Sequence, residues 1–244
     1  MNGIEAVPHM KTQRISIPVE PGEHVSGVFS IPEGYRSGEG RGIIVAHGAG
    51  NDMNSPLIVS FCDGLAGAGY PSLRFNFPYR EKGRKSPDSQ NVLVRTWKGA
   101  YGFFHNHPQY APERILAAGK SMGGRVASQM VAEGLLSVGG LIFLGYPLHP
   151  PGDKEKLRIA HLFQIRIPLL FFAGTRDSLC DPSLLRKTLK KLSVPWDLEV
   201  IEGGDHSFHV PQSSGLTEEA IFGRILQKTV EWLASPQLRK LTPR

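Results

Sequence analysis

Six short apolar segments constrain the fold of this chain more than any other feature of its sequence. They occupy residues 42–48, 70–77, 114–121, 139–147, 167–175 and 196–204. Continuous apolar strands are typical of parallel sheets, because such sheets are covered on both faces. Between the segments, apolar residues such as Leu93, Trp97 and Phe104 recur at helical spacing. The alternation predicts an α/β fold, with a mostly parallel, doubly wound sheet and helices on both faces.

The pattern along the chain predicts one domain over residues 1–244, because no repeat or linker interrupts it. A length of 244 residues is ordinary for a single large α/β domain. Within residues 1–40, polar and apolar side chains alternate, as in Arg14-Ile15-Ser16-Ile17. This alternation predicts a hairpin of two edge strands that belongs to the same domain.

Composition excludes several classes of protein. The hydrophobic content of 40% and charged content of 20% are typical of a globular protein. No segment approaches the length of a membrane span, and residues 1–20 lack the apolar core of a signal peptide. Cys62 and Cys180 provide neither a disulfide framework nor a metal cluster. We therefore expect a cytoplasmic protein with no membrane partner, no metal and no cofactor.

The net charge of +6 raises the question of a nucleic-acid partner. Most basic residues are spread through the chain, and the one dense run, at 80–85, has no interleaved aromatic residues. This run is typical of a solvated loop, so no nucleic-acid partner is expected.

The segment 117–124, AAGKSMGG, has two incompatible interpretations. A phosphate-binding P-loop also ends in GKS, but it needs a glycine seven residues before its serine. Arg114 stands at that position, and the apolar residues 115–118 predict a buried strand instead of an open loop. A dinucleotide-binding motif beginning at Gly48 fails in the same way, because Met53 replaces its third glycine.

The other interpretation is the G-x-S-x-G turn of a serine hydrolase, with Ser121 as nucleophile. The motif follows a predicted strand and precedes a predicted helix, which is the context that this turn requires. Asp177 and His206 follow two later strands, in the order serine, acid, histidine. Because the carboxyl ends of parallel strands meet at one edge, we expect Ser121, Asp177 and His206 to converge.

Neighbouring residues offer alternatives for the acid and the base. Asp181 precedes Pro182 and a helical segment, which is typical of a helix cap, so Asp177 is favoured. His209 lies further into the loop than His206. His105 and His107 resemble a metal-binding pair, but they precede a strand and belong at the opposite edge of the sheet.

Two backbone amides are candidates for an oxyanion hole. The segment from His47 to Gly50 follows the first buried strand and matches the glycine-rich loop that supplies one donor in hydrolases. The amides of Ala49 and Met122 are the expected pair. Lys120, at a free position of the motif, is expected to be solvated or to lie behind the site.

These motifs together resemble an α/β-hydrolase, and more narrowly the hydrolases related to dienelactone hydrolase. That group includes the hydrolase-like domains of certain vertebrate testis-expressed and chromatin-complex subunit proteins. The resemblance runs from about residue 42 to the C-terminus and rests on HGAGNDMNSP, LRFNF, GKSMGG, GYPLHPPG, GTRD and GGDHSF. Dienelactone hydrolases carry a cysteine where this chain has Ser121. Only residues 148–166 are available for a cap, so no large cap domain is expected.

The predicted function is hydrolysis of a small ester- or thioester-type acyl substrate through an acyl-enzyme. The basic run at 80–85 favours an anionic substrate, since it follows a strand at the same edge as the triad. The alternative is a non-catalytic interaction module with the same fold, because a fold does not fix a function. A monomer and a homodimer are both compatible with the sequence.

Overall fold

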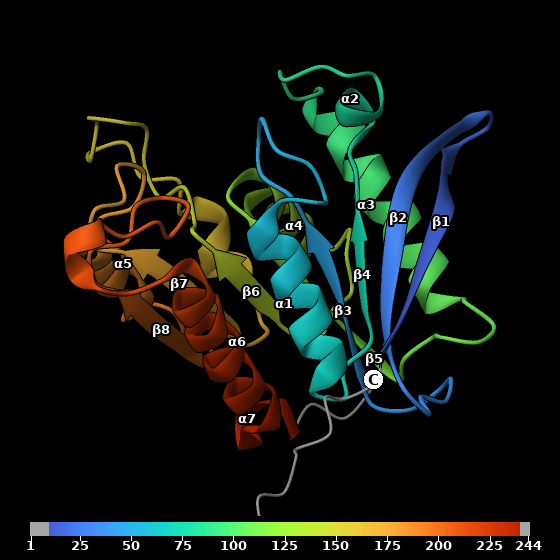
Figure 1. Ribbon diagram of the computed structural model, residues 1–244. Helices are drawn as coiled ribbons and strands as arrows, with labels where there is room; N and C mark the ends of the chain where they lie inside the picture. The colour runs from blue at the N-terminus through green and yellow to red at the C-terminus, as the bar shows by residue number, and fades with distance from the viewer. Residues whose placement is uncertain (1–9, 240–244) are drawn as a thin grey trace, which may run out of the picture.

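The computed structural model describes residues 10–239, which contain an eight-stranded sheet in the order β1-β2-β4-β3-β5-β6-β7-β8 (Figure 1). The β1–β2 and β2–β4 pairs are antiparallel, and the other neighbouring strands are parallel. This mostly parallel sheet confirms the predicted fold class. Residues 1–9 and 240–244 of the predicted domain lie outside the described residues. The strands are β1 (Met10–Glu20), β2 (Glu23–Pro32), β3 (Arg41–Ala46), β4 (Ser72–Phe75), β5 (Arg114–Lys120), β6 (Leu141–Leu144), β7 (Leu169–Gly174) and β8 (Trp196–Ile201).

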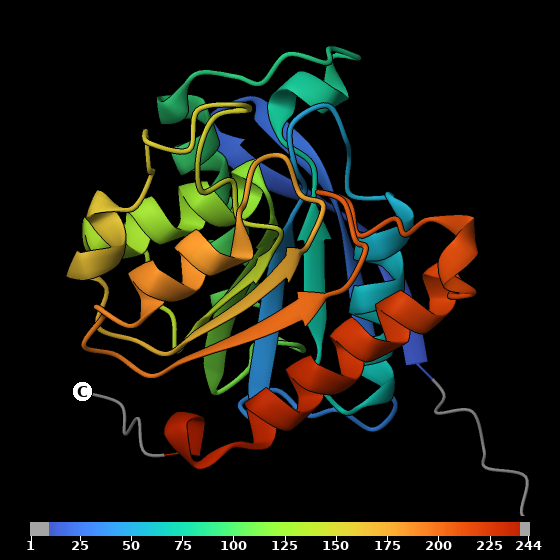
Figure 2. The same ribbon diagram turned by 90° about the vertical axis from the view of Figure 1, so that its left-hand side faces the viewer.

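Helices cover both faces of the sheet, as Figure 2 shows. On one face, α1 and α6 pack over a core layer that includes Leu116 and Ala118 of β5. On the other face, α3, α4 and α5 pack over a layer that includes Ile115 and Ala117. Successive residues of β5 therefore point to opposite faces, as in any strand. The helices are α1 (Pro56–Gly67), α2 (Pro78–Glu81), α3 (Gln90–His105), α4 (Met122–Ala132), α5 (Pro182–Leu189), α6 (Glu218–Ala234) and α7 (Pro236–Arg239), with the 3₁₀ turns η1 (Ala160–Gln164) and η2 (Gln212–Ser214).

The N-terminal strands differ in one respect from the predicted pair of edge strands. β1 lies at the edge, but β2 is also joined to β4, with Ser30 opposite Ser72. Phe29 packs against Phe104 of α3, while Ser30 donates a hydrogen bond of 2.7 Å to Asp63 of α1. Since helices cover both sides of β2, its central residues are buried on both faces, which the alternating sequence pattern did not indicate.

The connection from β6 to β7, residues 145–168, is too short for a separate cap. Its only regular element is the 3₁₀ turn η1. The expectation of no large cap is therefore confirmed. Within residues 10–239, none of the helices combines the length and the apolar character needed to cross a membrane.

Candidate active site

Ser121 occupies the tight turn between β5 and α4, with φ 50° and ψ −112°. This backbone conformation is disfavoured for residues other than glycine. The turn closes because the residues two positions before and after Ser121 are glycines. A Cβ atom at Gly119 would collide with the backbone of Gly124, and one at Gly123 would lie 2.7 Å from the carbonyl oxygen of Ala46. The sequence therefore folds here into the strand-turn-helix that presents a nucleophile.

His206 joins Ser121 to Asp177. The distance from His206 Nε2 to Ser121 Oγ is 2.9 Å, and that from His206 Nδ1 to Asp177 Oδ2 is 2.8 Å. An imidazole that donates from Nδ1 to a carboxylate has Nε2 available to accept the serine proton. The Asp177 side chain is 0% exposed, and its Oδ1 accepts a bond of 2.8 Å from the amide of Leu179. These two contacts hold the carboxylate in one orientation.

A backbone contact between the loops after β7 and β8 brings Asp177 and His206 together. A Cβ atom at Gly174 would collide with the carbonyl group of Gly204. The amide of Arg176 donates a hydrogen bond of 2.8 Å to the same carbonyl oxygen. Glycine at the end of β7 and glycine after β8 therefore allow Asp177 and His206 to approach each other.

The alternative acid, Asp181, is a helix cap. Its Oδ1 accepts hydrogen bonds from the amides of Ser183 (2.9 Å) and Leu184 (3.2 Å) at the start of α5. The ammonium of Lys154 lies 2.7 Å from the other oxygen. The hydrogen bond from Lys154, followed by the bonds from the helix amides, lowers the pKa of this carboxyl group. Asp181 is thus fully engaged away from His206.

The alternative base, His209, is also engaged elsewhere. Its Nδ1 lies 3.4 Å from Asp205 and its Nε2 lies 3.1 Å from Glu218 of α6. Asp205 in turn accepts hydrogen bonds from the amides of Ser207 (2.7 Å) and His209 (3.0 Å). This closed turn separates His209 from Ser121 and aims His206 at it instead.

Ser121 faces a cleft of 420 Å³ that is also lined by Ala49 and Met122. The two residues whose amides are the predicted oxyanion donors therefore lie at the same cleft as the serine. Met122 is the first residue of α4, so its amide lies at the positive end of that helix.

His47 and Tyr79 fix the peptide unit that carries the Ala49 amide, a role that the sequence analysis did not identify. The carbonyl oxygen of Gly48 accepts hydrogen bonds from His47 Nδ1 (2.8 Å) and from the Tyr79 hydroxyl (3.2 Å). Because N–H and C=O point in opposite directions in a trans peptide, the Ala49 N–H points away from both. The sequence feature that could have indicated this role is a histidine, His47, at the end of a buried strand and directly before a glycine.

The tautomer of His47 follows from its surroundings. The ring is 0% exposed, and this burial lowers its pKa to about 4, so it is neutral near pH 7. Nε2 accepts a hydrogen bond of 3.1 Å from the amide of Phe77. Nδ1 therefore carries the proton that is donated to the Gly48 carbonyl.

A family model described as "Alpha/beta hydrolase domain" matches residues 39–234 of this chain. The chain belongs to this family. Its eight-stranded sheet and short β6–β7 connection agree with that assignment. The predicted membership of the α/β-hydrolase superfamily is thus confirmed.

Two solved structures have the same fold as this α/β-hydrolase. A dienelactone hydrolase from Anabaena variabilis is 21% identical, with a TM-score of 0.69 over 91% of this chain and 96% of that chain. An α/β serine hydrolase without lid from Xanthomonas campestris is 19% identical, with a TM-score of 0.68 over 96% of this chain and 97% of that chain. The dienelactone-hydrolase-like resemblance is confirmed, while the link to testis-expressed proteins stays a prediction.

A curated relative from Mycobacterium tuberculosis carries the provisional name of a phosphoribosyl transferase. It is 24% identical to this α/β-hydrolase over 209 residues, which make up 84% of the present chain and 44% of the relative. The chain therefore spans less than half of that protein, and the name describes the longer molecule.

The basic run at 80–85 of this α/β-hydrolase is largely neutralised by acidic partners. Arg80 lies 3.5 Å from Asp52, and Lys82 lies 2.9 Å from Glu23. Arg84 pairs with Asp88. Asp52 and Glu23 come from distant segments and Asp88 lies just beyond the run, so the run alone overstated the positive charge at this edge.

Two other arginines provide positive charge at the cleft. Arg125 and Arg158 both line it, together with Ser121. Arg125 lies four residues after Ser121, with its amide bonded to the Ser121 carbonyl, so it projects from the first turn of α4. The sequence analysis missed it, although the spacing of four residues places two side chains on one helical face.

Of the two positions expected for Lys120, the solvated one is wrong, and the side chain lies behind the site. Its side chain is buried, with an exposed fraction of 6%. Lys120 ends β5 on the same face as Leu116 and Ala118, so it points toward α1 and α6, away from the cleft. Those two helices close over that face, which a local sequence pattern does not reveal.

Histidines at the end of α3 have local roles. The ring of His105 stacks on Tyr101 at 5.5 Å, and His107 Nδ1 accepts a hydrogen bond of 3.2 Å from the amide of Tyr110. Across the part of the chain that the structure describes, no group of three or more His, Cys, Asp or Glu side chains is arranged to hold a metal ion.

Proposed function

We propose that this α/β-hydrolase cleaves a small ester- or thioester-type acyl substrate through Ser121, His206 and Asp177. The observation that carries the proposal is the pair of hydrogen bonds made by His206, at 2.9 Å to Ser121 Oγ and 2.8 Å to Asp177 Oδ2. In this arrangement the histidine removes the serine proton while the carboxylate stabilises the imidazolium ion that forms.

The reaction proceeds in two halves. His206 Nε2 takes the proton of Ser121, and Oγ attacks the carbonyl carbon of the substrate. The amides of Ala49 and Met122 donate hydrogen bonds to the resulting oxyanion, and loss of one such donor typically costs about 10²- to 10³-fold in kcat. His206 then gives its proton to the departing alcohol or thiol. Water, activated by His206, hydrolyses the acyl-enzyme and releases a carboxylic acid.

The cleft favours a small acyl group that carries negative charge. Its volume is 420 Å³, and Arg125 and Arg158 line it beside the serine. Burial lowers the pKa of Arg125, but a guanidinium remains protonated near neutral pH. A second carboxylate on the substrate would meet these guanidinium groups. The fold shared with a dienelactone hydrolase and with esterases is consistent with an ester bond as target.

Labelling with a fluorophosphonate tests the proposal directly, because such probes react much faster with an activated serine than with an ordinary hydroxyl group. We expect wild-type protein to be labelled, Ser121→Ala to lose labelling and hydrolysis of p-nitrophenyl acetate, and Ser193→Ala to keep both. Ser193 is exposed and precedes β8, away from the cleft, so it is a matched control.

Two results would contradict the proposal. Labelling that persists in Ser121→Ala would remove Ser121 as nucleophile. A folded wild type that neither reacts with the probe nor hydrolyses any ester would instead favour the non-catalytic interaction module.

A further inference from the structure

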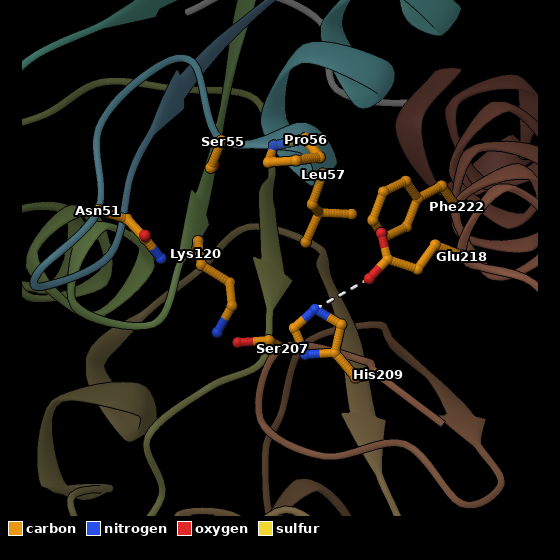
Figure 3. Close-up of a pocket in the computed structure, with 9 residues that line it drawn as sticks. All are labelled: Asn51, Ser55, Pro56, Leu57, Lys120, Ser207, His209, Glu218 and Phe222. Carbon is orange, nitrogen blue, oxygen red and sulfur yellow. Dashed lines mark ion pairs between the residues drawn. The ribbon is translucent and has the colours of Figure 1, made fainter. Parts of the chain in front are cut away.

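A second pocket, drawn in Figure 3, is lined by Lys120, the residue that precedes Ser121 in the chain. Its volume is 170 Å³, and it shares no lining residue with the cleft. Asn51, Leu57, Lys120, Ser207 and Phe222 contribute to its wall, from the β3–α1 loop, α1, β5, the loop after β8 and α6. The proposed acyl transfer uses none of these side chains.

Lys120 brings an unpaired positive charge into this pocket. Its side chain is 6% exposed, and Figure 3 shows the ammonium group directed into the space near Ser207. Among residues 10–239 the ammonium group makes no hydrogen bond and no ion pair. Burial lowers its pKa to about 8, while the more distant charges of Asp177 and Asp205 raise it. The group therefore remains largely protonated at neutral pH, without an anion beside it.

The N-terminus of α1 adds positive potential to the same pocket. This helix of 12 residues begins at Pro56, and its N-cap residue Ser55 makes no side-chain capping bond. Both residues line the pocket. The free amides in the first turn of a helix carry partial positive charge and favour an anion. Lys120 and α1 thus face one space with charge of the same sign.

The rest of the pocket selects the size and charge of the occupant. Pro56, Leu57 and Phe222 form an apolar side. A closed cavity of about 150 Å³ can hold a molecule the size of benzene, so a pocket of 170 Å³ has room for a compact hydrocarbon group. Glu218, paired with His209 at 3.1 Å, already places a carboxylate at the wall, which disfavours multiply charged anions.

We propose that this pocket binds a small organic carboxylate, with its charged group at Lys120 and the N-terminus of α1 and its hydrocarbon part against Leu57 and Phe222. The site is distinct from the cleft and does not depend on the proposed hydrolysis. Lys120 and Ser207, which line the pocket, are the chain neighbours of Ser121 and His206. A carboxylate bound in the pocket would therefore lie against the backbone behind Ser121 and His206.

Binding of benzoate and butyrate to Ser121→Ala protein, measured by calorimetry or ligand-observed NMR at neutral pH, tests this site without turnover. We expect both carboxylates to bind, neutral benzamide not to bind, and inorganic phosphate to bind more weakly than benzoate. Adding Lys120→Met should weaken benzoate binding by about ten-fold or more, since an interaction with a buried charge is lost.

Two control variants separate this pocket from other cations. Arg125→Gln removes a guanidinium from the cleft, and Lys190→Met removes an exposed ammonium from the end of α5. Lys190→Met should bind benzoate as well as the parent protein does, and Arg125→Gln should retain the benzoate binding that Lys120→Met loses. Should Lys120→Met fail to fold, Phe222→Asp replaces the half-buried ring with a carboxylate and should abolish binding by repulsion.

Three outcomes would overturn the proposal. The first is that neither carboxylate binds the parent protein. The second is that Lys120→Met, or Phe222→Asp in its place, binds benzoate with unchanged affinity. The third is that Arg125→Gln loses binding while the pocket variants keep it, which would place the carboxylate in the cleft.

Discussion

Ser121 and Lys120 are adjacent in the chain but belong to different surroundings. Ser121 faces the 420 Å³ cleft, where its hydroxyl lies 2.9 Å from the imidazole of His206. Lys120 faces the 170 Å³ pocket, where its ammonium has no partner among the described residues. Lys120 is the last residue of β5 and points toward one face of the sheet, whereas Ser121 lies in the turn that follows and points into the cleft.

The difference shows how one short motif can supply two unrelated sites. The hydroxyl group of Ser121 has a hydrogen-bond partner, His206, within the protein. A buried charge without a partner, in contrast, lowers the stability of a folded protein. Asp177 and Asp205 offset only part of this cost for Lys120, since burial is the largest influence on its pKa, and the proposed carboxylate would offset more of it.

The largest expected effect concerns the cleft side. Replacing Asp177 by Asn removes the carboxylate that fixes the His206 tautomer, and kcat/KM for p-nitrophenyl acetate should fall by about 10⁴-fold. Asp181→Asn is the matched control, because asparagine also caps a helix and α5 should persist. Equal losses in the two variants would contradict the assignment of Asp177.

A smaller effect is expected on the pocket side. The pKa of Lys120 is about 8 in the folded protein and 10.5 in its ordinary state. Between these pH values the unfolded chain binds more protons, so the free energy of unfolding of the wild type rises with pH relative to that of Lys120→Met. The variant should be more stable at neutral pH, with an advantage that shrinks by on the order of 3 kcal/mol across this window.

Urea unfolding of the two proteins at pH 8 and at pH 10.5 measures this difference. An advantage of Lys120→Met that is the same at both pH values would show that the ammonium is not held in a desolvated position. Added butyrate should reduce the advantage near neutral pH, because it binds the folded wild type alone.

Cations at the cleft should affect substrate choice more than turnover. Arg125→Gln should reduce the preference for an anionic over a neutral ester of equal length by about ten-fold, since one charge-assisted contact is lost. The measurement is the ratio of kcat/KM values for the two esters. Arg186→Gln, an exposed position on α5, is the control. An unchanged ratio in Arg125→Gln would exclude this arginine from substrate binding.

The smallest effect is expected at the loop that carries Ala49. Tyr79→Phe removes the hydroxyl that holds the Gly48 carbonyl at 3.2 Å. Because an oxyanion donor acts mainly in the transition state, kcat should fall by about five-fold with little change in KM. Tyr101→Phe leaves this loop intact and should change neither constant. A change confined to KM in Tyr79→Phe would argue against a positioning role.

Sequence periodicity was sufficient to predict the central strands and the edge at which the candidate site lies. The six apolar segments correspond to β3 through β8. Strands buried on both faces are apolar, whereas β8, at the edge of the sheet, is half-buried and also carries Asp197 and Glu199. The convergence of Ser121, Asp177 and His206 followed from the ends of three of these strands. The distances between these side chains could not be predicted, because they depend on close contacts between loops at glycine residues, such as Gly174 with Gly204.

Features that depend on partners from distant segments could not be predicted. The charges at 80–85 looked free in the sequence, yet Glu23 and Asp52 neutralise two of them. Lys120 looked exposed because lysine usually is, whereas α1 and α6 close over its face of the sheet. In each case the sequence pattern located the residue in the fold, but residues from distant segments determined whether its charge is paired or buried.

The short β6–β7 connection has a consequence for the kinetics of turnover. Enzymes with a lid are often limited by its opening and by product release. Residues 145–168 hold only one 3₁₀ turn, so no large element has to swing aside before a product diffuses out of the cleft. We therefore expect kcat to be insensitive to solvent viscosity. If hydrolysis of the acyl-enzyme is the slow step, esters that share an acyl group should be turned over at one rate, whatever alcohol leaves first.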